Sequence, residues 1–102
     1  MSKTNRIKLH NELLEFSDNV YFQPPESLRM NYPCIVYSKA GDFETQANDG
    51  YYIGMKEYDL TLIGYSPDSE LPEEIRDHFR MCSITQYYVT DSLQHVKLKL
   101  YY

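Results

Sequence analysis

The fold is decided near the start of the chain by Val20-Tyr21-Phe22-Gln23-Pro24-Pro25 and, a few residues later, by Tyr32-Pro33-Cys34-Ile35-Val36-Tyr37. Both phrases combine aromatic and β-branched residues, which favour extended strands. Proline limits each run because it has no backbone N–H to donate to a sheet. The two phrases therefore predict two strands joined by a tight excursion, and residues 26–31 between them have room for one helical turn.

Apolar spacing predicts one helix before these strands and a second helix late in the chain. The first helix has an apolar stripe made of Ile7, Leu9, Leu13, Leu14 and Phe16. Its wet side is made of Lys8, Asn11, Glu12 and Glu15. The second helix has apolar residues at steps of four, which are Leu71, Ile75 and Phe79. Pro72 fits the first turn of that helix because an N–H is not needed there.

Three more strands are predicted by alternating apolar residues and by the turns between them. The first spans Tyr51–Tyr65 and follows a hairpin turn at Asn48-Asp49-Gly50, where these residue types tolerate positive φ. The other two span Ser83–Val89 and His95–Tyr101 and are joined by Thr90-Asp91-Ser92. In the last strand every second residue is apolar, so we expect one face in the core and the other in water.

The resulting order is helix, strand, strand, strand, helix, strand, strand. The strand that starts at Cys34 is expected to continue to Phe43 across an interruption at Ala40-Gly41. This order predicts one domain over residues 1–102. Its class is α+β, a two-layer sandwich of a mostly antiparallel sheet with two helices packed on one face.

Composition narrows the classes of function. The 102 residues carry a net charge of -5, and the ten basic residues are scattered along the chain instead of forming the clustered face that binds phosphates. Fifteen acidic residues offset by those ten cations are too few for an acidic mimic of DNA. Cys34 and Cys82 cannot build a disulfide framework, which fits a reducing cytoplasm. The apolar stretches are too short for a membrane span, and the segment Ser2–Arg6 leads into no signal-peptide core, so we expect neither membrane insertion nor secretion.

Candidate catalytic residues occur without a catalytic spacing. The relevant residues are His10, His78, His95, Asp77, Asp91, Cys34 and Cys82. His78 follows Glu74 at helical spacing, which is typical of a surface pair, and His10 is expected to be a partly buried structural residue. We expect no catalytic residue, no cofactor and no metal site, although folding can still bring a Cys and a His together at a metal.

Eleven tyrosines without a tryptophan are the other unusual feature of the composition. Most are expected to be strand residues half covered by the core. Three adjacent pairs differ, because neighbouring strand residues face opposite sides of a sheet and one member of each pair must leave the main core. The pairs are Tyr51-Tyr52, Tyr87-Tyr88 and Tyr101-Tyr102.

The order of elements resembles the tail terminator proteins of long-tailed bacteriophages and prophages. The resemblance rests on the opening helix, the phrase Tyr32–Tyr37 with its proline, the long strand leading to Asp68-Ser69, and the second helix. It covers nearly the whole chain. Phrases similar to Tyr-Phe-Gln-Pro-Pro and Tyr-Pro-Cys-Ile-Val-Tyr also occur in small proteins encoded between the head and tail genes of phages.

The resemblance implies a structural protein of the virion and not an enzyme. Tail terminators form a ring of six subunits that caps the tail tube, ends its polymerisation and joins it to the head. The implied partners are further copies of the chain, the tail tube protein and a head completion or connector protein, while DNA passes through the lumen without specific binding. The implied location is the neck of the virion, assembled in the cytoplasm of the host bacterium.

A closed ring needs two different surfaces that meet. We predict one half at Phe43, Tyr51 and Tyr52, and the other half at Tyr87, Tyr88, Tyr101 and Tyr102. We also predict an acidic loop that faces the lumen or the tube, made of Asp42, Glu44 and Asp49. The alternative for that loop is an ordinary solvated hairpin tip.

Three other functions stay open at this point. The first is a head completion or adaptor protein of the same connector. The second is a non-viral module that binds one protein partner through its aromatic sheet edge and is a monomer by itself. The third is a small hydrolase or transferase, which would need a pocket that the sequence does not reveal.

Overall fold

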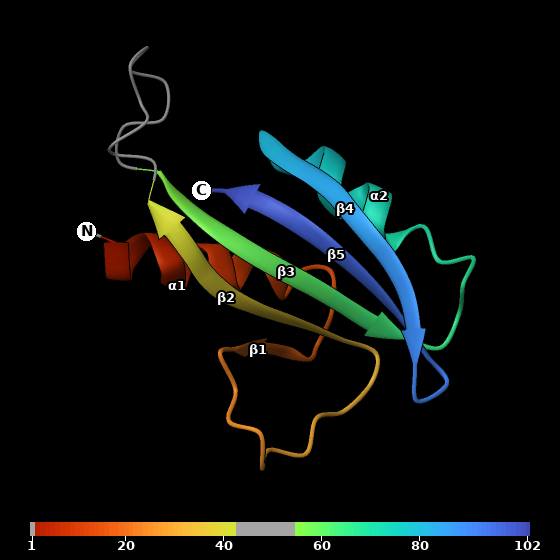
Figure 1. Ribbon diagram of the computed structural model, residues 1–102. Helices are drawn as coiled ribbons and strands as arrows, with labels where there is room; N and C mark the ends of the chain where they lie inside the picture. The colour runs from red at the N-terminus through yellow and green to blue at the C-terminus, as the bar shows by residue number, and fades with distance from the viewer. Residues whose placement is uncertain (1, 43–54) are drawn as a thin grey trace.

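The computed structural model describes residues 2–42 and 55–102 (Figure 1). The elements follow one another as α1 (Ser2–Leu13), β1 (Val20–Phe22), β2 (Cys34–Asp42), β3 (Lys56–Gly64), α2 (Leu71–His78), β4 (Met81–Thr90) and β5 (Leu93–Tyr101). The class is α+β, a five-stranded mixed and mostly antiparallel sheet with two helices packed against it. The sequence prediction of the fold class is confirmed.

The strands lie in the order β1-β2-β3-β5-β4, so β1 and β4 are the two edges of the sheet. β1 pairs with β2 in parallel, and the other neighbours are antiparallel. The predicted interruption at Ala40-Gly41 is a bulge in β2, where the register with β3 shifts between Lys39 and Gly41. A second bulge interrupts β4 between Ile84 and Gln86.

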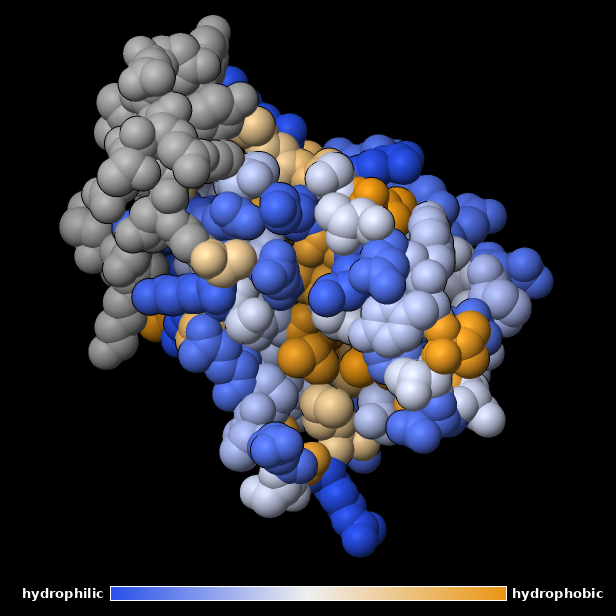
Figure 2. All heavy atoms as spheres, in the orientation of Figure 1, coloured by the Kyte–Doolittle hydropathy of each residue, from blue (hydrophilic) through white to orange (hydrophobic). Residues whose placement is uncertain are grey.

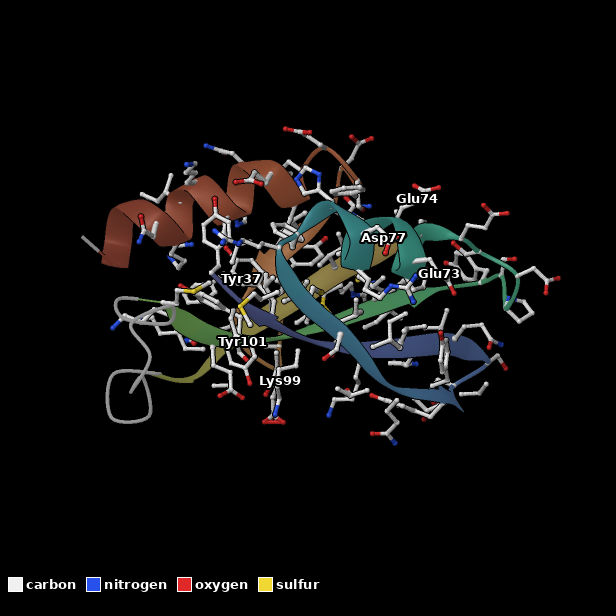
Figure 3. All side chains as sticks on the ribbon, turned by 90° about the horizontal axis from the view of Figure 1, so that it is seen from above. Tyr37, Glu73, Glu74, Asp77, Lys99 and Tyr101 are labelled. Atoms are coloured by element: carbon white, nitrogen blue, oxygen red, sulfur yellow. The ribbon has the colours of Figure 1, made fainter. Side chains whose placement is uncertain are left out.

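Both helices lie on the same face of the sheet, and within residues 2–42 and 55–102 no helix or strand packs on the other face, called the open face below (Figures 1 and 3). The core between helices and sheet contains residues that are less than 2% exposed, which are Leu9, Leu13, Ile35, Tyr37, Tyr58, Leu60, Ile75, Leu98 and Leu100. Lys99 and Tyr101 point to the open face, which shows a mixed polar and apolar surface (Figures 2 and 3). On that face Lys99 forms an ion pair with Glu57 at 3.3 Å.

The first helix differs from its prediction in which residues it buries. Leu9 and Leu13 are fully buried, whereas Ile7 and Leu14 are 45% and 40% exposed. One residue turns a helix by about 100°, so Leu9 and Leu13 share one side and Ile7 and Leu14 lie nearly opposite. The predicted stripe therefore consists of two groups of apolar residues on different sides of the helix, and the sheet covers only one of these groups.

The segment between β1 and β2 does not form the helical turn for which it has room. It contains one turn-like backbone hydrogen bond, from the Leu28 N–H to the Pro25 carbonyl at 3.1 Å. Its ends are fastened to β1, since the Asn31 N–H donates to the Tyr21 hydroxyl at 3.0 Å. Asn19 supports the start of β2 by donating its side-chain amide to the Pro33 carbonyl at 3.1 Å. The Tyr32-Pro33 peptide bond is cis.

Candidate interaction site

The edge strand β4 is the most unusual surface among the described residues. Its sequence, Met81-Cys82-Ser83-Ile84-Thr85-Gln86-Tyr87-Tyr88-Val89-Thr90, contains no charged residue and no proline. Beyond the bulge, every residue of the run 86–90 is exposed, and within the described chain no strand pairs with the outer side of β4. Edge strands of soluble proteins are usually protected by charged side chains, prolines or bulges, and only the bulge is present here.

Pairing with β5 shows which way the two tyrosines of β4 face. Tyr87 lies opposite the buried Val96 and is therefore on the helix side, while Tyr88 lies opposite His95 on the open side. The Tyr88 ring stacks on the His95 ring with their centroids 4.7 Å apart. Tyr87 is 62% exposed and Val89, two residues further along the same face, is 60% exposed. The prediction that the tyrosine pair faces opposite sides of the sheet is confirmed.

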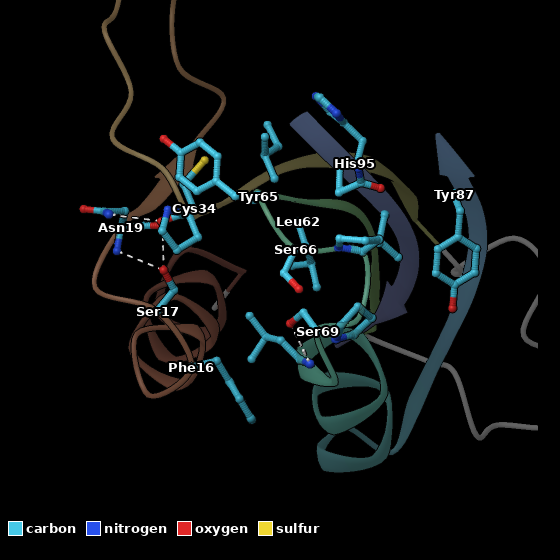
Figure 4. Close-up of a pocket in the computed structure, with 18 of the residues that line it drawn as sticks. Phe16, Ser17, Asn19, Cys34, Leu62, Tyr65, Ser66, Ser69, Tyr87 and His95 are labelled. Carbon is cyan, nitrogen blue, oxygen red and sulfur yellow. Dashed lines mark hydrogen bonds between the residues drawn. The ribbon is translucent and has the colours of Figure 1, made fainter. Parts of the chain in front are cut away.

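A groove of about 550 Å³ opens on the helix side, beside this end of β4 (Figure 4). Its apolar lining includes Phe16, Leu62, Leu71, Pro72 and Val96. Two serines of its lining hold local turns, since the Ser66 and Ser69 hydroxyls accept hydrogen bonds from the N–H groups of Asp68 and Leu71. The lining contains no lysine or arginine, so the groove offers neither of these permanent positive charges to an anionic ligand.

The buried cysteine beside this groove is not an activated nucleophile. Burial raises the pKa of Cys34 to about 11, which keeps the sulfur protonated near neutral pH. Burial likewise raises the pKa of Cys82, on β4, to about 11, although Arg76 opposes this effect. Cys34 is only 2% exposed, and both cysteines are free.

His10 takes part in a side-chain network that joins α1 to β2. Arg6 donates to the Tyr37 hydroxyl at 3.3 Å, and this hydroxyl lies 2.7 Å from Nδ1 of His10. Arg6 can only donate, so the Tyr37 hydroxyl accepts from it and keeps its own hydrogen for an acceptor such as Nδ1 of His10. Burial and then the charge of Arg6 lower the pKa of His10, which fits a neutral ring that accepts this hydrogen bond. The expectation that His10 is partly buried is confirmed.

Glu12 joins α1 to α2 and to the end of the chain. Its carboxylate accepts a hydrogen bond from the Tyr102 hydroxyl and lies 3.0 Å from Nε2 of His78. Burial opposes ionisation of Glu12, but the bonds from Tyr102 and His78 outweigh it and leave the pKa of the carboxyl below its ordinary value. Two predictions are wrong here: Glu12 is partly buried instead of wet, and His78 binds Glu12 instead of forming a pair with Glu74.

The four described tyrosines of the predicted ring contact do not form one surface. Tyr87 and Tyr88 lie opposite residues 95–96, whereas Tyr101 lies opposite Met81, six residues further along β5 than His95. At about 3.3 Å per residue, Tyr88 and Tyr101 are roughly 20 Å apart. Tyr102 packs edge-on against Phe79 and is half-buried at the core rim.

The other residues of the predicted surfaces lie mostly outside the described part of the chain, namely Phe43, Tyr51 and Tyr52 of the ring contact and Glu44 and Asp49 of the acidic loop. Asp42 is the last residue of β2. Val89 is a further member of the exposed surface that was not predicted from the sequence, and the groove was not predicted either. The sequence does contain a feature that singles out Val89, because this residue lies near the end of the uncharged run Met81–Thr90, just before a turn.

Comparison of the chain with protein-family models, with curated proteins and with solved structures found no match. Within residues 2–42 and 55–102, no three His, Cys, Asp or Glu side chains are grouped so that they could hold a metal ion. In the same part of the chain, no helix has the length and apolar character needed to cross a membrane.

Proposed function

We propose that the protein is a structural assembly subunit that acts through its surfaces. The observation that carries this proposal is that the sheet presents an uncharged edge strand with exposed Tyr87, Tyr88 and Val89 beside an open face. Large exposed aromatic and aliphatic side chains next to an unpaired strand are typical of surfaces that bind another protein.

Within this class we propose a tail terminator, a subunit of a ring that caps the tail tube of a long-tailed phage and joins it to the head. The order of elements that suggested this family is the order found in the fold. A head-to-tail ring also needs two different surfaces on different sides of each subunit. The roughly 20 Å between Tyr88 and Tyr101 supports such an arrangement, with one tyrosine in each surface.

Light scattering behind a sizing column tests the proposal on the purified chain, alone and with purified tail tubes. We expect a species of six times the chain mass of 12.1 kDa, either in solution or bound at the tube ends. Tyr88→Ala and Tyr101→Ala should each reduce this species. Tyr65→Ala is the matched control, because Tyr65 is 65% exposed but lies outside the predicted contact. A chain that stays monomeric alone and does not bind tubes would contradict the ring and favour a module for a single partner.

A further inference from the structure

The sheet has two edges, and they differ in how they are protected. β1 has only three residues, a length that itself limits pairing, and the chain that follows it, residues 23–33, forms a loop beyond this edge (Figure 1). β4 has ten residues, none charged, and its regular run 86–90 follows the bulge. An exposed uncharged edge of this kind is a template for another strand. Of the two edges, β4 is therefore the better suited to accept a strand.

The sequence of this run is complementary to itself. Suppose that β4 of a second copy pairs antiparallel with this strand about a two-fold axis at Tyr88. The numbers of any two facing residues then sum to 176. Tyr87 then faces Val89 of the second copy on the helix side, and Val89 faces its Tyr87. On the open side Tyr88 faces itself and Gln86 faces Thr90. Every exposed large side chain of the run gains a neighbour, and no charge faces another charge.

We propose that residues 86–90 of β4 pair with the same residues of a second copy, so that two five-stranded sheets become one. The run has the features that this contact needs. Tyr87, Tyr88 and Val89 are 62%, 36% and 60% exposed, and the five residues keep a regular register with β5 from Gln86 to Thr90. The bulge next to Ile84 ends this regular register.

The two-fold contact excludes the contact of the proposed ring, a consequence that rests on the proposed function. A two-fold contact joins identical surfaces and closes at two copies, whereas a ring joins different surfaces. Both would use Tyr88, so one subunit cannot make both contacts at once. The pair and the ring would therefore be alternative states of one subunit.

An added cysteine tests the two-fold contact directly, with the unmodified chain, which already contains the free cysteines Cys34 and Cys82, as the background. Directly paired residues have Cβ atoms about 4.5–5.5 Å apart, so Tyr88→Cys places two thiols within reach of a disulfide or a short bifunctional thiol reagent. We expect most of the Tyr88→Cys protein to become a covalent dimer. Ser83→Cys is the matched control, because Ser83 is exposed on the same strand but lies on the other side of the bulge. A mixture of Gln86→Cys and Thr90→Cys should crosslink, while each of these variants alone should not.

Sedimentation of the unmodified chain over a range of concentrations gives a second measurement that does not depend on cysteine. Tyr88→Lys places two like charges opposite each other at the axis and should raise the dissociation constant of the dimer by about tenfold or more. Ser83→Lys should leave it unchanged. Equal crosslinking of Tyr88→Cys and Ser83→Cys, or a dimer indifferent to Tyr88→Lys, would overturn the two-fold contact.

These results separate the two proposals. A head-to-tail ring brings Tyr88 next to a different residue, so a six-subunit species without a Tyr88–Tyr88 crosslink would overturn the two-fold contact and leave the ring standing. A specific Tyr88–Tyr88 crosslink in a chain that never exceeds two copies, even with tail tubes, would support the two-fold contact and overturn the ring.

Discussion

Replacing Glu12 by alanine should weaken the fold more than any other change to an acidic residue of the first helix region. The Glu12 carboxylate receives hydrogen bonds from Tyr102 and His78, which lie 90 and 66 residues away in sequence. A hydrogen bond to a charged group contributes about 1.5–3 kcal/mol. Solvent reduces this contribution, because the side chains of Glu12 and His78 are 26% and 36% exposed. We therefore expect Glu12→Ala to lower the free energy of unfolding by about 2 kcal/mol.

Urea unfolding followed by circular dichroism measures this change. A loss of about 2 kcal/mol corresponds to a midpoint lower by about 1 M urea and to a melting temperature lower by roughly 10 °C. The control is Glu15→Ala, since Glu15 is exposed close to the end of α1. Equal midpoints for Glu12→Ala and Glu15→Ala would refute the reasoning.

The stabilisation by Glu12 should also depend on pH. The pKa of Glu12 is lower in the folded chain than its ordinary value of 4.5, so the folded state binds this proton less readily than the unfolded state. The stabilisation is complete above 4.5 and is lost as the pH falls through the folded pKa. The difference between the unmodified chain and Glu12→Ala should therefore shrink in acid. A difference that stays constant down to the acid transition would show that the carboxylate charge is not involved.

Four other perturbations have defined outcomes. Burial lowers the pKa of His10 from 6.5, so stability should fall as the pH drops below that value, and His10→Phe should flatten this part of a urea-unfolding profile. Ile75 is fully buried, so Ile75→Ala should cost about 2–5 kcal/mol and Ile75→Val only about 0.5–1.5 kcal/mol by the same measurement. Ser92 has a φ of 64°, so Ser92→Gly should raise the free energy of unfolding by about 1 kcal/mol. Gly64→Ala should change it by less than about 0.5 kcal/mol, because the added Cβ would lie 3.5 Å from Cβ of Pro33, an ordinary contact.

Local patterns were enough to predict most of the fold. Alternation in the last strand placed Val96, Leu98 and Leu100 in the core, and steps of four did the same for Ile75 and Phe79. These patterns work because an element with one apolar face has only one way to bury it. The first helix has apolar residues on two sides, and no local rule says which side the sheet covers. The Glu12 network could not be predicted either, because its partners come from distant parts of the chain.

The positions of the tyrosines in the sheet could have been predicted from the sequence. The turn at residues 91–92 is the whole connection between β4 and β5, so it fixes the register of the hairpin. Counting back from that turn puts Tyr88 opposite His95 and leaves Tyr101 at the far end. Treating Tyr87, Tyr88, Tyr101 and Tyr102 as one edge ignored this count. The bulge in β4 could not be predicted in this way, because no residue of the strand indicates where the register shifts.

The distribution of charge over the sheet supports the proposal that a partner covers β4. The charged residues of the open face lie on the inner strands β3 and β5, where Asp59 pairs in register with Lys99 and Thr61 with Lys97. Charges there are surrounded by paired strands and do nothing to repel an incoming strand. The edge itself has none, so an uncovered β4 would join chains without limit or be covered by one defined partner. The proposed contacts both close, one at two copies and the other in a ring, and either would cover this edge without leaving a free edge for further chains.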